Sequence, residues 1–271
     1  MGKGYFKMKP ALALLRLYAY AARELPPKDV ANLFANPQTE LSQTPPSQRV
    51  HMTAINGLVG RTHYHEIKDF MARNDNFNFF FWDDAAADNL MEEHFSGQRI
   101  FEVYQQCQHG IMRADIFRLC VLLIHGGWYF DLKSQFQGKL DTIPLETGIF
   151  YLVNEDNKAD LENPLLDKYT SGNIIANWVM AALPGLPHIS SILDYIADEF
   201  PRFNDWRHQH GFVRAVWETT GPRMLTRYFV TTGFAEKLRI IYNDDSNMQP
   251  KYACRGAWVR GLIHQHYTSV K

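Results

Sequence analysis

The sequence predicts an α/β fold built on a mainly parallel sheet. From Arg49 onward, short apolar segments of strand length alternate with longer segments of helical pattern, an order typical of parallel sheets covered by helices. The chain has 271 residues, which is enough for one large domain. Its composition, 46% hydrophobic and 21% charged, argues against the disordered, collagenous and coiled-coil classes.

The expected strands are apolar or aromatic runs bounded by polar or turn residues, at 49–55, 77–82, 128–132, 148–154 and 238–242. The expected helices lie at 63–74, 85–94, 111–125, 173–182, 190–200 and 223–229, with another starting near Phe101. Gly126 and Gly127 end the most apolar helix. Asp83, Asp84 and Asp131 follow strands, and such sheets bind ligands outside the carboxyl ends of their strands.

We expect three parts along the chain: an N-terminal helix over residues 1–25, a Pro-rich linker over 26–48 and the main domain over 49–271. The apolar stretch 10–22 contains Arg16 and is shorter than the roughly 18 residues that a membrane span needs. The favoured interpretation is an amphipathic helix docked on the body. A helix lying on a membrane surface and a cleaved signal peptide are the alternatives.

Charge and cysteine content limit the partners and the compartment. The chain has 28 Lys and Arg against 29 Asp and Glu, so no chain-wide basic field for nucleic acid exists. Cys107, Cys120 and Cys254 are odd in number and form no CxxC pair, which argues against a disulfide framework. We therefore expect a cytoplasmic protein, with peripheral membrane association through the N-terminal helix as an open alternative.

The most informative segment covers residues 113–133. Asp115 and Arg118 lie three apart on one face of an otherwise apolar helix, so each must be paired or face a cleft. The Gly126-Gly127 turn then leads into a strand that ends at Asp131. Three charged groups therefore converge on one crevice, which fits a structural salt bridge as well as a ligand site.

This segment resembles glycosyltransferase family 32, the sugar-binding region with an Asp-any-Asp motif, and more distantly the glucosylating domains of large clostridial toxins. The family pattern is Arg-Ala/Ser-Asp, two residues, Arg, apolar residues, Gly-Gly, then aromatic-any-Asp-any-Asp. The sequence matches it at Arg113, Ala114, Asp115, Arg118, Leu122, Gly126, Gly127, Tyr129 and Asp131. Weaker similarity, over roughly residues 48–270, includes the segments at His51, Asp83-Asp84, Asn173, Thr220-Gly221-Pro222, His264 and Ser269.

The resemblance implies a GT-A-like fold and a glycosyltransferase that moves a hexose from a UDP- or GDP-sugar to a saccharide acceptor, such as a surface polysaccharide, with retention of configuration. It implies that the catalytic residues are Asp115, Arg118, Asp131 and Asn173, with the first two holding hydroxyls of the donor sugar. It implies that the donor is bound by His51, Asp83, Asp84, Gly126, Gly127, Tyr129, Lys133 and Ser269.

Two positions depart from the family pattern. Lys133 replaces the last acid of the Asp-any-Asp motif, and Ala54 stands where a Trp follows the first strand. The family implies Mn²⁺ or Mg²⁺, which would be held by Asp131 and His264, with His266 or Asp83 as other second ligands. Alternatively, the Lys133 ammonium pairs with phosphate and replaces the metal.

Two other functions stay open. Lys133 also suits a noncatalytic protein that binds sugar nucleotides or glycans, and the toxin similarity suits a transferase that modifies protein. The remaining histidines have no zinc spacing, so we interpret His63, His65, His208 and His210 as solvated surface side chains, the last two in a polar loop.

Overall fold

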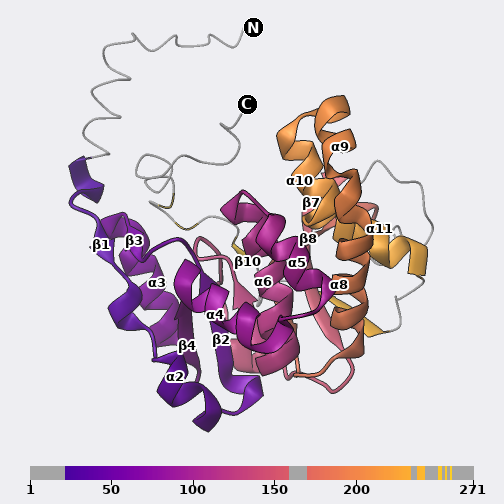
Figure 1. Ribbon diagram of the computed structural model, residues 1–271. Helices are drawn as coiled ribbons and strands as arrows, with labels where there is room; N and C mark the ends of the chain where they lie inside the picture. The colour runs from indigo at the N-terminus through magenta and orange to yellow at the C-terminus, as the bar shows by residue number, and fades with distance from the viewer. Residues whose placement is uncertain are drawn as a thin grey trace, which may run out of the picture.

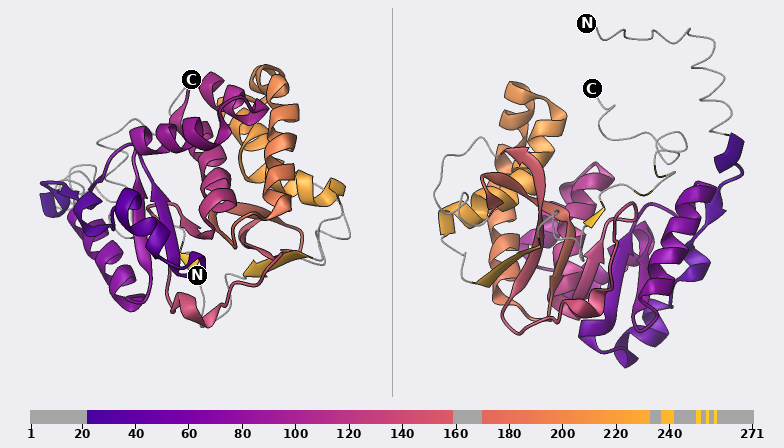
Figure 2. Two further views of the ribbon diagram at one scale, coloured as in Figure 1. Left: turned by 60° about the horizontal axis from the view of Figure 1, so that its bottom comes forward. Right: turned by 180° about the vertical axis from the view of Figure 1, so that it is seen from behind.

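The computed structural model describes residues 22–158, 170–232, 237–241 and 250–251, together with Cys254 and Ala257. The expected N-terminal helix lies outside the described residues as far as residue 21. Figure 1 shows the arrangement: the N-terminal elements β1 to α4 lie at one end of the sheet, and α8 to α11 lie at the other. The rotated views in Figure 2 show the same separation.

The central sheet contains six described strands in the order β4-β2-β5-β8-β7-β9. They are β4 (Asn78–Trp82), β2 (Arg49–Thr53), β5 (Gly127–Phe130), β8 (Asn173–Ala182), β7 (Phe150–Lys158) and β9 (Leu238–Ile241). Neighbours pair in parallel except at β8, which is antiparallel to both β5 and β7. The predicted α/β class with a mainly parallel sheet is therefore confirmed.

Both faces of the sheet are buried, because side chains alternate between two hydrophobic clusters. On β5, Trp128 and Phe130 point to one face and pack in the cluster that includes Ile67 and Phe70 of α3 (Arg61–Arg73). Tyr129 points to the other face. That face is covered by α4 (Asp84–Phe95), α5 (Arg99–Gln106), α6 (Gly110–His125), α8 (Pro187–Glu199), α10 (Phe212–Thr219) and α11 (Pro222–Thr232).

One helix prediction is wrong, and two helices were not expected. Residues 173–182 form strand β8, in which every residue after Asn173 is buried. A continuous apolar run of this length fits a fully buried strand as well as a helix, and here sheet pairing decides. Helix α9 (Phe203–His210) includes His208 and His210, which were expected to lie in a polar loop, and helix α10 lies where the sequence analysis named no element.

The predicted Pro-rich linker contains short elements that pack on the domain. It includes β1 (Lys28–Asp29), η1 (Ala31–Leu33), α2 (Pro37–Glu40), η2 (Leu41–Gln43) and η3 (Pro46–Gln48). Val30 is completely buried, and β1 pairs with β3 (Leu58–Val59). The remaining short elements are η4 (Leu140–Thr142), η5 (Phe200–Arg202), β6 (Gln135–Phe136) and β10 (Pro250–Lys251).

The described chain begins with a short helical piece, residues 22–24, that is fixed to the body. Glu24 is buried, and its carboxylate accepts hydrogen bonds from the backbone N–H and the hydroxyl of Thr62. A carboxylate at this place satisfies an N–H group in the first turn of α3 and interacts favourably with the helix dipole. Among the described residues, no helix has the length and apolar character needed to span a bilayer.

Candidate functional site

A turn of two glycines connects α6 to β5 and sets the direction of the strand. Gly126 and Gly127 have φ angles of 63° and 101°. A Cβ on Gly126 would lie 2.4 Å from Cδ of Pro184, and a Cβ on Gly127 would lie 2.5 Å from the Arg49 carbonyl oxygen. Both positions therefore require glycine. They lie at the amino end of β5, whereas Asp131 follows its carboxyl end, so the structure does not bring the glycines to the acidic side chains.

Arg118 joins two carboxylates that come from different elements. Its Nη2 lies 3.0 Å from Oδ1 of Asp115, one turn earlier on α6, and 3.4 Å from Oδ1 of Asp131. The Arg118 and Asp115 side chains are 2% and 4% exposed, whereas that of Asp131 is 22% exposed. The structure thus brings together the three charged residues that the sequence placed in one crevice, and Asp131 is the accessible one.

Asp115 has two further partners that the sequence did not predict. Asn177 Nδ2 donates to its Oδ1 at 2.9 Å, and the Thr220 hydroxyl donates to its Oδ2 at 3.0 Å. The Asn177 carbonyl also accepts from Nη1 of Arg118. The signal for Asn177 is a single amide within a run of apolar residues, where a buried polar group needs a partner. Asn173, which the sequence analysis placed in the site, does not occupy this position. It pairs with Lys158 at the start of β8.

Burial changes the pKa values of Asp115 and of the neighbouring Tyr129. Burial raises the pKa of Asp115 to about 6, although Arg118, Thr220 and Asn177 oppose the shift. Burial also raises the pKa of Tyr129, whose hydroxyl donates to Oδ1 of Asp131 at 3.2 Å. The Arg118 guanidinium lies 5.1 Å from the centroid of the Tyr129 ring. Tyr129 is therefore a neutral donor that supports Asp131 across the neutral pH range.

Residues after Asp131 lie beside the C-terminal part of the chain. The Lys133 carbonyl accepts from the Cys254 backbone N–H at 2.7 Å, and β6 pairs with β10. Lys133 itself is half-buried. The predicted donor ligand Ser269 and the predicted metal ligand His264 lie outside the described residues, as does His266.

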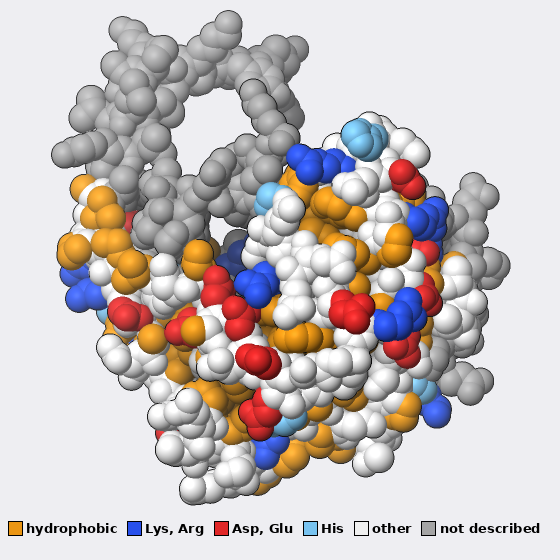
Figure 3. All heavy atoms as spheres, viewed as in Figure 1, with side chains coloured by type: hydrophobic (Ala, Val, Ile, Leu, Met, Phe, Trp, Pro, Cys, Tyr) orange, Lys and Arg blue, Asp and Glu red, His pale blue; other side chains and the backbone are white. Residues whose placement is uncertain are grey.

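A second polar group lies at the carboxyl end of β4. Asp83 caps α4 by accepting from the Ala86 N–H at 2.8 Å, and burial raises the pKa of the neighbouring Asp84. On the next turn, Oδ1 of Asp88 forms an ion pair with Arg113, whose Nη2 lies 2.8 Å away. Figure 3 shows acidic side chains over α4, in the middle of that face. Since β4 and β5 flank β2 in parallel, these groups share a sheet edge with Asp131.

His51 has a structural position. Its Nδ1 accepts from Nε1–H of Trp82 at 3.2 Å, which leaves Nε2 to donate to the Gly126 carbonyl at 2.9 Å. Burial lowers its pKa to about 3, so the ring stays neutral. Both ring nitrogens are therefore used within the fold, and none is left for a nucleotide. The interpretation of His63 as a surface residue is wrong, because it is completely buried with Nε2 2.9 Å from the Leu132 carbonyl.

The described part of the chain contains no metal site built from protein side chains alone. Within residues 22–158, 170–232 and the short pieces after them, no three His, Cys, Asp or Glu side chains gather as a group able to hold an ion. Asp131 supplies one accessible carboxylate at the predicted place. One carboxylate combined with phosphate oxygens of a substrate suits Mg²⁺, which often keeps few protein ligands.

Part of the chain matches a known protein family. Residues 60–149 match the glycosyltransferase sugar-binding region containing the DXD motif. The family resemblance predicted from the sequence is thereby confirmed for this segment. The matched segment includes Asp83, Asp115, Arg118 and Asp131, whereas Asn177 and Thr220 come from the chain beyond it.

Two curated relatives share part of the sequence. The initiation-specific alpha-1,6-mannosyltransferase of Schizosaccharomyces pombe is 28% identical over 53% of this chain and 38% of its own length. The putative glycosyltransferase HOC1 of Saccharomyces cerevisiae is 29% identical over 41% of this chain and 29% of its own length. The matches thus span about a third of these relatives.

Two solved structures show weaker overall similarity. The PaToxG glycosyltransferase covers 82% of this chain and 76% of its own, at 16% identity and a TM-score of 0.49. The UDP-bound glycosyltransferase domain of the YGT toxin covers 67% of this chain and 56% of its own, at 11% identity and a TM-score of 0.42.

Proposed function

We propose that this protein is a GT-A-like glycosyltransferase that moves a hexose from a UDP- or GDP-sugar to a saccharide acceptor. One observation carries the proposal: within a matched sugar-binding region, Arg118 joins the buried Asp115 to the accessible Asp131 at the carboxyl edge of the sheet. Ligands of α/β folds bind at this edge. The two curated relatives, a mannosyltransferase and a putative glycosyltransferase, support sugar transfer.

The burial of the three charged residues suggests how they divide the work. Asp131, the exposed member, makes the direct contact with the donor. Arg118 and Asp115 are almost completely buried, so they hold Asp131 in place and offer the sugar at most their outer edges. Asp83 and Asp84, which follow β4 at the same sheet edge, lie on the nucleotide side of the site. A rigid set of charges costs little reorganisation when the donor binds.

We further propose that Asp131 would hold Mn²⁺ or Mg²⁺ when the donor binds. A bound divalent ion neutralises charge on the leaving diphosphate. Lys133, two residues after Asp131, replaces the second carboxylate of the motif, so phosphate oxygens must supply more of the coordination. His264 stays a predicted second ligand.

Retention of configuration is part of the proposal. A double-displacement route needs a carboxylate free to attack the sugar carbon. Asp115 is occupied by Arg118, Asn177 and Thr220, which makes it a poor nucleophile. Asp131 accepts from Tyr129 and faces Arg118. A front-face reaction assisted by the leaving phosphate fits these contacts better.

The test combines donor binding with turnover. Thermal unfolding would be followed with a panel of UDP- and GDP-hexoses, with and without Mn²⁺, because a ligand that binds the folded state raises Tm. Donor hydrolysis and transfer to mono- and oligosaccharides would then be measured with the best donor. Asp131→Asn should abolish turnover and keep the fold. Asp69→Asn, an exposed acid on α3, is the matched control and should keep full activity.

The outcomes separate the rival functions. Full turnover in Asp131→Asn contradicts the proposed site. Donor binding without turnover on any saccharide or protein supports the noncatalytic binding protein, for which Lys133 is the motivating departure from the motif. Transfer to protein but not to saccharides supports the toxin-like alternative.

A further inference from the structure

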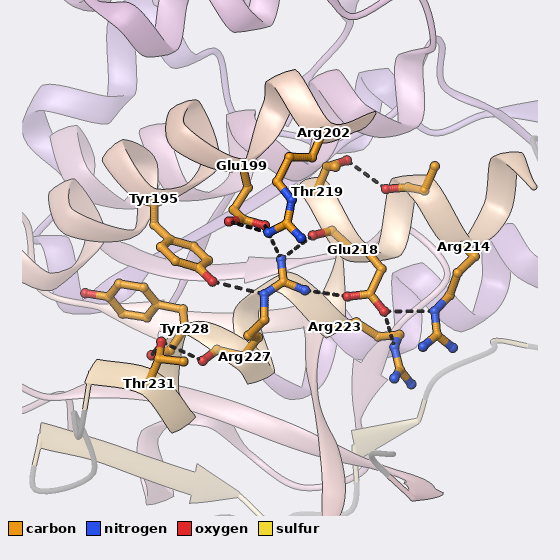
Figure 4. Close-up of polar contacts among 11 residues, drawn as sticks. Tyr195, Glu199, Arg202, Arg214, Glu218, Thr219, Arg223, Arg227, Tyr228 and Thr231 are labelled. Atoms are coloured by element: carbon orange, nitrogen blue, oxygen red, sulfur yellow. Dashed lines mark hydrogen bonds and ion pairs between the residues drawn. The ribbon is translucent and has the colours of Figure 1, made fainter. Parts of the chain in front are cut away.

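A cluster of charged residues centred on the buried Glu218 joins helices α8, α10 and α11, away from the three charges of the candidate site. Figure 4 shows these side chains converging on Glu218 and Arg227. Oε1 of Glu218 accepts from Nε of both Arg214 and Arg223 at 2.8 Å, and Oε2 accepts from Nη1 of Arg227 at 2.5 Å. The Glu218 side chain is 6% exposed. One carboxylate thus holds three arginines from both sides of the α10–α11 turn.

Arg227 extends the cluster to α8. Its Nε donates to the Tyr195 hydroxyl at 3.0 Å, and its Nη2 donates to Glu199 Oε2 at 2.7 Å and to the Glu218 carbonyl at 2.9 Å. All three nitrogens of the guanidinium therefore have partners. A planar guanidinium with this many bonds fixes the relative positions of the groups that it joins.

The turn that this cluster encloses carries Thr220. Thr220 and Gly221 both donate their backbone N–H to the Val216 carbonyl at 3.0 Å, and Pro222 begins α11. A Cβ on Gly221 would lie 2.9 Å from Cα of Trp217, so the turn has no room for a side chain there. The Thr220 hydroxyl projects from this fixed turn to Oδ2 of Asp115.

We propose that Glu218 and Arg227 are positioning residues of the donor site, which hold the α10–α11 turn so that Thr220 fixes the Asp115 carboxylate. The assignment to a donor site rests on the proposed function, but the coupling from Glu218 through Thr220 to Asp115 does not. Glu218 lies two residues before Thr220, and Arg227 lies seven residues after it. The α10–α11 turn is therefore fixed on both sides of Thr220. It determines the orientation of Asp115 and does not contact the sugar.

The direction in which the pKa of Asp115 changes distinguishes a positioning role of Glu218 from a direct effect of its charge. Loss of the Thr220 hydrogen bond raises the pKa of Asp115, because this bond stabilises the ionised form. Loss of the negative charge of Glu218, taken by itself, has the opposite effect and lowers the pKa of Asp115. Arg118, Asp131 and the Cys107 thiol also face Asp115 and stay unchanged in every variant.

The experiment is a pH titration of the Asp115 carboxyl carbon by NMR in the full chain, with the signal assigned by Asp115→Asn. Thr220→Val should raise the pKa of Asp115 by about one unit, and Thr220→Ser should leave it unchanged. Glu218→Gln and Arg227→Lys should also raise it. Combining Glu218→Gln with Thr220→Val should raise the pKa of Asp115 no further than Thr220→Val alone, since the positioning effect acts through the Thr220 hydroxyl and only the opposite effect of the lost charge remains.

Arg202→Gln is the matched control. Arg202 belongs to the same cluster but is 56% exposed and contacts Glu199, so its loss should leave the pKa of Asp115 unchanged. If Glu218→Gln does not fold, Arg227→Lys, which keeps the charge, carries the test. A lower Tm with an unchanged or lowered pKa of Asp115 in Arg227→Lys would overturn the proposal and leave the cluster purely structural. Failure to bind any sugar nucleotide would instead contradict the proposed function and leave the titration result intact.

Discussion

Replacing Asp115 by Asn should change how the stability of the protein depends on pH. The substitution removes a buried negative charge and keeps the size of the side chain and one carbonyl oxygen for Arg118. Burial raises the pKa of Asp115 from its ordinary 3.8 to about 6 in the folded protein. A raised folded-state pKa gives stability that is fully present below the unfolded-state value and is lost as the pH rises through the folded-state value.

The magnitude follows from the two pKa values. The whole shift lowers the free energy of unfolding by about 3 kcal/mol at high pH, of which about 2 kcal/mol falls between about pH 4.5 and about pH 7.5. Asn at this position does not titrate. The variant should therefore gain about 2 kcal/mol relative to the wild type over the same interval. His51, whose pKa is lowered to about 3, titrates in both proteins and cancels in the comparison.

The assay is urea denaturation of both proteins at the two pH values, with the free energy of unfolding extrapolated to water. The absolute cost of the substitution is less informative, because loss of the charge partner of the buried Arg118 is itself destabilising. The difference between the two pH values isolates the titration. An equal stability difference at both values, or a loss by the variant as the pH rises, would refute the reasoning.

Three further predictions concern other features. Gly127→Ala should cost more than about 2 kcal/mol in urea denaturation because of its positive φ and the nearby Arg49 carbonyl, whereas Gly97→Ala, with nothing within 4 Å, should cost about 1 kcal/mol; equal costs would contradict this. Glu24→Gln should lower stability by about 1 kcal/mol through the weaker cap on α3, and an unchanged Tm would count against it. Lys133→Asp should make donor binding more dependent on Mn²⁺, and Lys133→Ala should weaken binding without metal; two unchanged titrations would show that Lys133 does not act at the diphosphate.

Most of the sheet could be predicted from the sequence, because its strands are short apolar runs bounded by polar residues or turns. The strands at 49–53, 78–82 and 127–130 and the buried helix α6 lie within a few residues of their expected bounds. Strand β8 could not be predicted, since a run that is buried on both faces carries no period of two. Helix α9 was missed because its polar residues, His208 and His210 among them, suggested a loop.

The candidate site was predictable only in part. Asp115, Arg118 and Asp131 lie within 17 residues of one another, so a helix, a turn and a strand determine their meeting. Asn177 and Thr220 lie 62 and 105 residues after Asp115 in the sequence. No local pattern indicates that they contact it. His51 illustrates the opposite error: a histidine at a promising strand position is fully used by Trp82 and Gly126.

The antiparallel strand β8 has a consequence for the order in which the protein forms. During synthesis, α6 leaves the ribosome with Asp115 and Arg118 well before Asn177 and Thr220 exist, because these two residues lie 62 and 105 positions after Asp115. Until β8 pairs between β5 and β7, this ion pair lacks the Asn177 amide and carbonyl, and until the α10–α11 turn is in place it lacks the Thr220 hydroxyl. Desolvating the Asp115–Arg118 pair before these partners are in place is therefore unfavourable, so the buried pair depends on segments that are distant in the sequence.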